Sequence, residues 1–371
     1  MREETIARAQ TRRIHCPRAA TCLPTCLCVF GATPRENNPM MRERYLTAYR
    51  WMLLARISEE KYANLLRASK IAGGVFIGKG QEAISVSTAM ALEKGDIFAP
   101  LIRDQAGRLA FGESLLDATR TYLGSRLGPM RGRDGNVHRG RPREGYMAMI
   151  SHLGAMISVV SGALIARRAK GEPGAIGAVS LGEGGTSTGA FHEALNQAAV
   201  EKLPLVVVVT NNQYAYSTPT ARQFACASLA DKAVGYGIEG HTIEFGNDLS
   251  ECMDVIGGAA QRARAGHGPQ LVVASILRLG GHGEHDDAHY VLDTLKRSKT
   301  GTDCLKLTEQ FIVHEGLATA EELERWRAAA ALQVEEAVAT AQREPAPDPA
   351  TEEWCAISTK RLVDGYGGGC Q

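Results

Sequence analysis

One short segment, PLVVVVT at residues 204–210, limits the fold more than any other part of this 371-residue sequence. Its four consecutive valines, Val206 to Val209, leave no polar side chain to face water. β-Branched residues favour strands, and a strand that is apolar on both sides must be covered on both faces. The run therefore predicts a central strand of a parallel sheet with helices packed on either side.

The segments around this run alternate between strand-like and helix-like patterns. We expect strands over 176–181, 241–245 and 270–277, and helices over 186–202 and 249–265. This order predicts an α/β fold, a doubly wound and mainly parallel sheet with right-handed crossovers and helices on both faces.

The rest of the chain contributes helices and one long loop. Further helices are expected over 43–70, 81–92, 114–123, 153–168 and within 306–343, and a short extended segment over 97–102. The apolar run in 153–168 covers ~14 residues, too few to cross a bilayer, and predicts a buried core helix. Residues 126–146 are rich in Gly, Arg and Pro and predict a loop, and a loop of this length in a compact chain is usually functional.

Composition excludes some function classes. The net charge of +1 gives no general attraction to nucleic acid or to an anionic membrane, so a small-molecule ligand and protein partners are expected instead.

We expect residues 41–345 to form one domain, preceded by a disordered extension over 1–40 and followed by a tail over 346–371. Arg131, Arg133, Arg139, Arg141 and Arg143 suggest a basic patch, but without aromatic neighbours an ordered loop at a phosphate site is favoured.

The extension leaves several interpretations open. Its apolar cluster over 26–30 is shorter than the ~7–15 residues of a secretory signal core, so export is not expected. A mitochondrial transit peptide and a true start at Met40 or Met41 both remain possible. Four cysteines lie beside His15 without the spacing of a standard zinc site, and reduced thiols in a cytoplasm explain them more simply: Cys16, Cys22, Cys26 and Cys28.

Two unusual loops follow neighbouring strands of the predicted sheet. Gly182-Glu183-Gly184-Gly185 comes directly after the strand 176–181, and Asn211-Asn212-Gln213-Tyr214 comes after the valine run. Ligands bind outside the carboxyl ends of strands in such sheets, and glycines let main-chain N–H groups approach a phosphate. A carboxylate facing a phosphate needs a bridging cation, and carboxylate, amide and carbonyl oxygens suit magnesium. Either loop alone is more simply explained as turn chemistry, but together they predict one ion site.

The same motifs carry a family resemblance. Gly182-Glu183-Gly184, followed after twenty-six residues by Asn211-Asn212, resembles the thiamine-diphosphate motif of the transketolase-like superfamily. Within it, residues 43–345 resemble the alpha subunit of 2-oxo acid dehydrogenases, through Gly78-Lys79-Gly80-Gln81-Glu82-Ala83, Arg103 before Gly107, and Gly281-His282-Gly283 with Asp286-Asp287. Residues 214–220 and the Val137-His138 loop are most similar to the branched-chain members.

The resemblance implies a set of site residues. Glu183 and Asn212 would bind magnesium through their side chains and Tyr214 through its main-chain carbonyl. Leu153 would lie beneath the thiamine ring system and enforce its bent shape, and His282 would be the catalytic residue that donates protons or stabilises charge. The complete set of implied cofactor-binding residues is Arg103, Ser151, Leu153, Gly182, Glu183, Gly184, Asn212, Tyr214 and His282.

The resemblance also implies an activity: oxidative decarboxylation of a 2-oxo acid, pyruvate or a branched-chain one, with acyl transfer to the lipoyl group of an acyltransferase. A separate beta subunit would supply the glutamate that activates the cofactor, so two alpha and two beta chains are expected and the alpha chain alone would be inactive. The compartment would be the cytoplasm, or the mitochondrial matrix in a eukaryote. Three alternatives remain: an acetoin dehydrogenase alpha subunit, a non-oxidative thiamine-diphosphate lyase or transketolase, and a cofactor-less regulatory or scaffolding relative.

Some positions depart from the family pattern. Ile102 replaces an aromatic residue before Arg103, so one polar contact to the diphosphate is expected to be missing, and His152 stands where Pro is common. Ala155 and Met156 replace polar residues that help form a monovalent-cation site in branched-chain members, so no potassium site is expected. Gly283 stands where animal enzymes carry a regulatory phosphoserine, so that control is not expected. His285 and His289 have no assigned role, and four other histidines are expected to be structural: His138, His192, His241 and His267.

Overall fold

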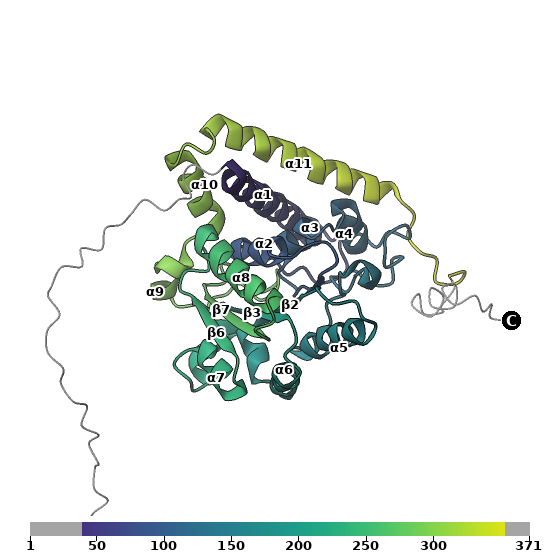
Figure 1. The fold of residues 1–371 in the computed structure, drawn as a ribbon. Coiled ribbons are helices and arrows are strands. Elements are labelled where there is room, and N and C mark those ends of the chain that lie inside the picture. Colours follow the sequence, from purple (N-terminus) through teal and green to yellow (C-terminus); the bar gives the residue numbers. More distant parts are fainter. Residues whose placement is uncertain (1–38, 353–371) are drawn as a thin grey trace, which may run out of the picture.

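The computed structural model describes residues 39–352, which pack around a five-stranded parallel sheet (Figure 1). The strand order is β1-β2-β3-β7-β6, and every pairing within this sheet is parallel. The strands are β1 (Ile97–Ala99), β2 (Gly177–Gly182), β3 (Leu205–Asn211), β7 (Gln270–Ser275) and β6 (Glu239–Ile243). A separate two-stranded ribbon joins β4 (Tyr214–Ala215) to β5 (Thr218–Pro219). The predicted α/β class with a mainly parallel sheet is confirmed.

The valine run in β3 is buried on both faces of the sheet, as expected. Val206 and Val208 belong to one hydrophobic core, and Val207 and Val209 to another on the opposite face. The first core is covered by α1 (Pro39–Arg67), α2 (Glu82–Met90) and α8 (Leu249–Arg264), and the second by α5 (Ala155–Ala169) and α6 (Gly189–Val200) (Figure 1).

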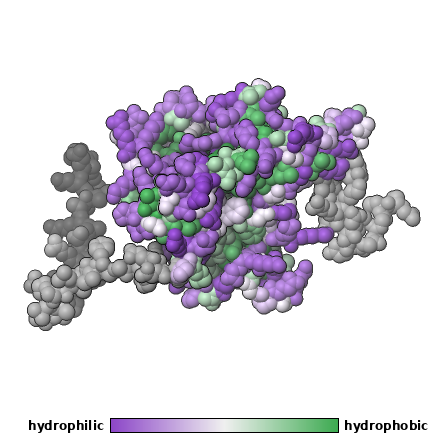
Figure 2. Space-filling model, turned by 90° about the horizontal axis from the view of Figure 1, so that it is seen from above, coloured by the Kyte–Doolittle hydropathy of each residue, from purple (hydrophilic) through white to green (hydrophobic). Residues whose placement is uncertain are grey.

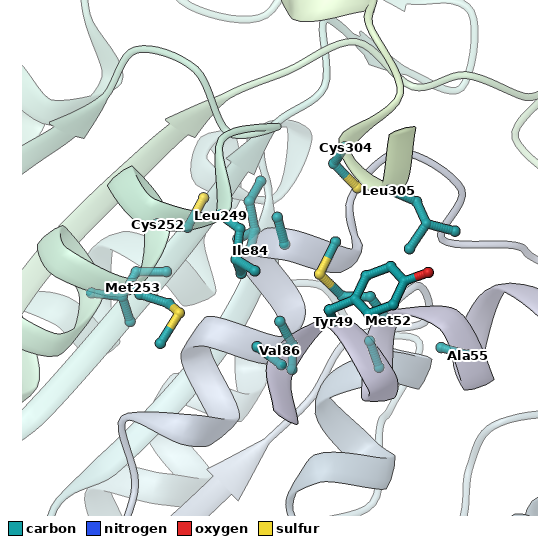
Figure 3. Close-up of a cluster of buried hydrophobic side chains, with 14 of the residues drawn as sticks. Tyr49, Met52, Ala55, Ile84, Val86, Leu249, Cys252, Met253, Cys304 and Leu305 are labelled. Atoms are coloured by element: carbon teal, nitrogen blue, oxygen red, sulfur yellow. The ribbon is translucent and has the colours of Figure 1, made fainter. Parts of the chain in front are cut away.

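The first core is the larger of the two. Tyr49 and Met52 of α1 pack with Ile84 and Val86 of α2, and side chains of α8 and α10 (Cys304–His314) close the cluster (Figure 3). A last helix, α11 (Ala320–Arg343), lies along α1 (Figure 1). The expected helical region over 306–343 is therefore two helices, separated at Gly316, where φ is +61°.

The prediction of a buried core helix over 153–168 is only partly right. A helix is present as α5, but the side chains that it buries are confined to one face: Ile157, Val160, Ser161 and Leu164. Val159 on the other face is 45% exposed. An apolar run shows that a helix needs cover, but it does not show that the cover comes from the same chain.

The remaining elements are short. α4 (Leu115–Tyr122) matches the expected helix, whereas α3 (Gln105–Ala110), α7 (Lys232–Tyr236) and α9 (Asp293–Lys296) were not predicted. Helices of four to six residues show too little periodicity to be recognised in a sequence.

The loop over 126–146 has one 3₁₀ turn, Pro142–Glu144, and the segment after α11 packs against it. Glu344 accepts hydrogen bonds from Arg120 and Ser125. Glu352 is buried, and its carboxylate pairs with three arginines of the loop: Arg126, Arg131 and Arg133.

The predicted extension over 1–40, with its four cysteines and possible zinc site, lies outside the described residues except for the start of α1. No helix within residues 39–352 is long and apolar enough to span a bilayer. The face on the side of α11 is mainly hydrophilic, with small separate hydrophobic patches (Figure 2).

Candidate functional site

A cleft of about 280 Å³ opens at the carboxyl ends of β2 and β3. Eight of the nine predicted site residues line it: Arg103, Ser151, Leu153, Gly182, Glu183, Asn212, Tyr214 and His282. The ninth, Gly184, directly follows Glu183, and a Cβ atom on it would lie 2.7 Å from the Cβ of Ala215, which lines the cleft. The structure therefore brings the predicted residues together at one place, and Gly184 is required there for close packing.

Glu183 follows β2 and is only 1% exposed. Its carboxylate accepts a hydrogen bond of 3.3 Å from the main-chain N–H of Asn212 and one of 3.4 Å from Nε2 of Gln223. Burial raises the pKa of this carboxyl, because desolvation disfavours its charged form. A bound cation would offset that cost.

Asn212 follows the paired strand β3 and is also buried. Its Nδ2 donates to Oε1 of Gln81 at 3.4 Å, which leaves the side-chain oxygen Oδ1 buried without a hydrogen-bond partner in the described structure. Buried polar atoms nearly always have a hydrogen-bond partner or a metal ion, so this oxygen is available to bind a ligand. A buried carboxylate beside an unsatisfied amide oxygen fits a hard cation such as magnesium.

The third predicted ligand is the main-chain carbonyl of Tyr214. It accepts a hydrogen bond of 3.2 Å from Nη1 of Arg278, and a carbonyl oxygen keeps a second lone pair for another partner. Among residues 39–352 no cluster of three or more His, Cys, Asp or Glu side chains could hold a metal. The donors here are one carboxylate, one amide and one carbonyl, which suits magnesium better than zinc.

Two buried guanidiniums lie in the same cleft. Arg103 is 7% exposed and Arg278 is 3% exposed. Arg103 donates to the main-chain carbonyls of Ile77 and His282, and Arg278 donates to carbonyls as well. Burial, followed by repulsion from Arg278, lowers the pKa of Arg103 to about 10. Two buried positive charges held by carbonyl dipoles are chemically suited to an anion.

His282 lies at the mouth of the cleft beside these cations. Its ring stacks on Tyr216 with 3.5 Å between centroids and meets the edge of Phe76. Burial, with repulsion from Arg103 and Arg278, lowers the pKa of His282 to about 4. The free site therefore holds a neutral imidazole at neutral pH, which can donate a hydrogen bond but does not carry the extra proton.

The loop Gly78-Lys79-Gly80 packs closely against the main chain of Arg103. A Cβ atom on Gly78 would lie 2.2 Å from the carbonyl oxygen of Arg103, so only glycine allows this contact. The N–H of Gly78 donates to the buried carboxyl of Glu59 at 2.9 Å, and the N–H of Gly80 donates to Glu82 at 2.7 Å. Burial, followed by the nearby charge of Glu82, raises the pKa of Glu59 to about 8.

Ser151 and Leu153 approach the cleft from the segment before α5. Leu153 is 44% exposed, which leaves its apolar side chain free to contact a bound molecule. The Ser151 hydroxyl lies 3.2 Å from Nε2 of His138, which comes from the loop over 126–146. This loop contributes to the cleft wall, as its length and composition indicate.

The five arginines of the suggested basic patch differ in their surroundings. Arg139 is buried and pairs with Glu113, with 2.8 Å between Nη2 and Oε2. Arg131 and Arg133 pair with Glu352, and Arg141 pairs with Glu144. The first three serve to order the loop rather than to present charge at the surface.

Several residues in the cleft or next to it carried no assigned role in the sequence. Arg278 follows the carboxyl end of β7, so the strand-end argument that found Glu183 could have found it. Gln223 contacts Glu183 from a distant segment and gave no signal of its own. Gln81 contacts Asn212 and belongs to the family motif over 78–83, but that motif assigned it no role. Phe76 enters the site only through the fold, whereas Tyr216 belongs to the segment 214–220 that carries part of the resemblance.

Sequence comparisons found several proteins that are similar to this chain. A family model described as dehydrogenase E1 component matches residues 49–350. The alpha subunit of acetoin:2,6-dichlorophenolindophenol oxidoreductase from Cupriavidus necator is 33% identical over 84% of this chain and 93% of the relative. The 2-oxoisovalerate dehydrogenase subunit alpha of Bacillus subtilis is 37% identical over 64% of this chain and 72% of the relative. The pyruvate dehydrogenase E1 component subunit alpha of Rhizobium meliloti is 29% identical over 83% and 88%.

Proposed function

The chain belongs to the dehydrogenase E1 component family as an alpha subunit, and on this premise we propose that it acts with a separate beta subunit on a 2-oxo acid. The reaction is oxidative decarboxylation of pyruvate or a branched-chain 2-oxo acid, with acyl transfer to the lipoyl group of an acyltransferase. The cofactors are thiamine diphosphate and magnesium.

One observation supports the cofactors above all: the unsatisfied Oδ1 of Asn212 lies in a cleft with the buried carboxylate of Glu183 and two buried guanidiniums. Glu183, Asn212 and the carbonyl of Tyr214 would hold magnesium. Arg103, Arg278 and the main-chain N–H groups of Gly182 and Gly184 would face the diphosphate, because magnesium alone leaves it negatively charged. When bound, thiamine diphosphate supplies the nucleophilic carbon and the electron sink for decarboxylation.

Leu153 and His282 would act on the bound molecules in other ways than by binding the diphosphate. The exposed side chain of Leu153 would offer an apolar contact to the bound cofactor and would exclude water there. Arg103 lies 3.5 Å from Nδ1 of His282 and can only donate, so the neutral imidazole keeps its proton on Nε2. His282 then presents an N–H at the cleft mouth, where it can stabilise negative charge that develops on the substrate.

The chain also needs protein partners. Leu153 and the outer face of α5 remain exposed in the single chain, which accords with a site completed by a beta subunit. We propose an assembly of two alpha and two beta chains that delivers its acyl group to a lipoylated acyltransferase. Its compartment is the cytoplasm, or the mitochondrial matrix if the source is eukaryotic.

A binding experiment tests the cofactors. The coexpressed alpha–beta pair is titrated with thiamine diphosphate by calorimetry, once with magnesium and once with a chelator. Binding that requires magnesium and is lost in Glu183→Ala is the expected result, with Glu193→Ala on the exposed face of α6 as the control. Absence of magnesium-dependent binding would refute the enzyme proposals and leave the cofactor-less scaffolding alternative.

An activity experiment tests the substrate. Pyruvate and 2-oxoisovalerate are supplied to the pair with an artificial electron acceptor, and carbon dioxide release is measured. The alpha chain alone should be inactive, since it provides only half of the site. Full activity of the isolated alpha chain would contradict the division between subunits.

Acetoin is the second candidate substrate, because the relative from Cupriavidus necator is an acetoin oxidoreductase subunit that matches over most of both chains. Acetoin is tested beside the 2-oxo acids with the same acceptor. A higher kcat/KM for acetoin would replace the 2-oxo acid proposal and leave the cofactor site unchanged. Release of carbon dioxide without use of any acceptor would instead favour the non-oxidative lyase alternative.

A further inference from the structure

Three side chains on one wall of the cleft form a continuous chain of hydrogen bonds. Oδ2 of Asp134 lies 2.9 Å from Nδ1 of His138, and Nε2 of His138 lies 3.2 Å from Oγ of Ser151. Asp134 and His138 come from the loop over 126–146, and Ser151 comes from the segment before α5. His138 and Ser151 both line the cleft.

Donor and acceptor chemistry orients this chain in one direction. An ionised carboxylate only accepts, so Nδ1 of His138 carries the proton and donates to Asp134. Nε2 is then an acceptor, and the Ser151 hydroxyl must donate to it. The N–H of Asn136 donates to the other oxygen of Asp134 at 2.7 Å, which holds the carboxylate in place. The Ser151 oxygen is left with free lone pairs at the cleft.

A role limited to ordering the loop does not account for this arrangement. Asp134 and His138 are four residues apart in the same loop, and their contact alone would serve that purpose. The third member is an exposed hydroxyl thirteen residues beyond His138, on a separate segment. Carboxylate, imidazole and hydroxyl in this order raise the basicity of the hydroxyl oxygen, as they do in nucleophilic catalysis.

We propose that Asp134, His138 and Ser151 form a proton relay that opens into the cleft at the Ser151 hydroxyl. Ser151 accepts a proton from an O–H or N–H donor of the bound molecule while its own proton passes to Nε2 of His138. The resulting imidazolium is stabilised by the negative charge of Asp134, and the proton returns by the same route. Ser151 touches the bound molecule, and His138 and Asp134 are positioning residues. That this molecule is thiamine diphosphate or its substrate rests on the proposed function.

Serine reactivity tests the relay without any turnover. The full-length chain, alone and with the coexpressed beta subunit, is freed of cofactor and magnesium and treated with diisopropyl fluorophosphate. Ser151 Oγ bonds to phosphorus, fluoride leaves, and the hydroxyl proton goes to His138. Mass spectrometry follows the rate at Ser151 and at Ser217, an exposed serine that lines the adjoining hollow with His282.

Ser151 is expected to react faster than Ser217, and His138→Gln should slow its labelling by about 100-fold, the scale of general base assistance. Asp134→Asn keeps nearly the same shape and should also slow the labelling of Ser151. This second variant tests the relay even if the His138→Gln chain does not fold. The relay proposal is wrong if Ser151 is labelled no faster than Ser217. It is also wrong if neither substitution changes the rate of labelling at Ser151.

A protection experiment separates the relay from the proposed function. Magnesium with thiamine diphosphate should slow the labelling of Ser151 in the alpha–beta pair and leave Ser217 less affected. If labelling depends on His138 but thiamine diphosphate gives no protection, the relay stands and the proposed cofactor fails. If thiamine diphosphate binds but labelling does not depend on His138, the cofactor stands and the relay fails.

Discussion

The main-chain N–H of Asn212 donates a 3.3 Å hydrogen bond to the carboxylate of Glu183, and this bond joins the ends of two neighbouring strands. β2 and β3 are paired in register as far as Gly182 and Thr210, so each side chain follows its strand directly. The sheet itself therefore sets the distance between the two proposed magnesium ligands, and no loop has to close to bring them together.

Glu183→Gln should stabilise the chain without ligands while removing magnesium-dependent binding. A buried carboxylate without a cation is costly, and an amide of the same shape avoids that cost, so we expect a gain of about 1 kcal/mol in the free energy of unfolding. Denaturant unfolding in a chelator measures the gain, and calorimetry measures the loss of binding. Glu193→Gln on the exposed face of α6 is the control. A less stable variant would show that the carboxylate is satisfied within the chain.

Glu59→Gln should protect the chain against loss of stability at raised pH. The folded pKa of about 8 lies above the ordinary value of 4.5, so between these values the folded state binds more protons than the unfolded state. Stability from this group is present below pH 4.5 and falls as pH rises through 8. Glutamine keeps an oxygen for the N–H of Gly78 and does not ionise.

The measurement for this prediction is the unfolding free energy between pH 5 and 9, a range that spans the folded pKa of about 8. The variant should show a flatter profile than the parent, whereas Glu60→Gln, at the exposed neighbouring position that pairs with Lys79, should follow the parent. Parallel profiles for Glu59→Gln and the parent would mean that Glu59 is already ionised in the folded chain.

His282 should titrate with a pKa near 4 in the chain without ligands, because burial and the charges of Arg103 and Arg278 disfavour its imidazolium. Inorganic diphosphate with magnesium should raise that pKa, since an anion bound between the guanidiniums reduces their repulsion. Nuclear magnetic resonance of labelled histidine follows the titration, and His282→Asn assigns the signal. A pKa at or above 6.5 in the free chain would show that the two guanidiniums do not act on the imidazole.

Glu352→Gln should loosen the loop over 126–146. The buried carboxylate pairs with Arg126, Arg131 and Arg133, and its loss leaves three guanidiniums without their shared partner. Limited digestion with trypsin, which cuts after arginine, should become several-fold faster at Arg131 and Arg133 because local opening becomes easier. Glu324→Gln, on the exposed side of α11, should leave the digestion unchanged. Equal cleavage of parent and Glu352→Gln would show that the loop is ordered by other contacts.

The fold and the proposed magnesium ligands could be predicted because each depends on local pattern. The valines of β3 require cover on both faces, and the two motifs at the strand ends must meet once the strands pair. What could not be predicted depends on contacts between distant segments. Glu59 reaches Gly78 only through the packing of α1, and Gln223 reaches Glu183 from forty residues away.

The error about α5 has a different physical origin. An apolar residue in the sequence predicts that its side chain will be buried. Whether it is buried in the single chain depends on whether another part of that chain packs against it. Val159 is apolar and exposed at once, so the two properties conflict until another surface is added. The same limit applies to Leu153 at the start of this helix.

The strand order has a consequence for the way the chain is made. β7 lies between β3 and β6, although it is the last of the five strands to be synthesised. Until residue 275 has left the ribosome, β6 has no neighbour in the sheet and one edge of β3 stays open. The pair formed by Glu183 and Asn212 can assemble during synthesis, whereas Arg278 arrives only with the final strand. The nascent chain thus gains the two proposed magnesium ligands before Arg278, which is one of the two guanidiniums that would bind the diphosphate.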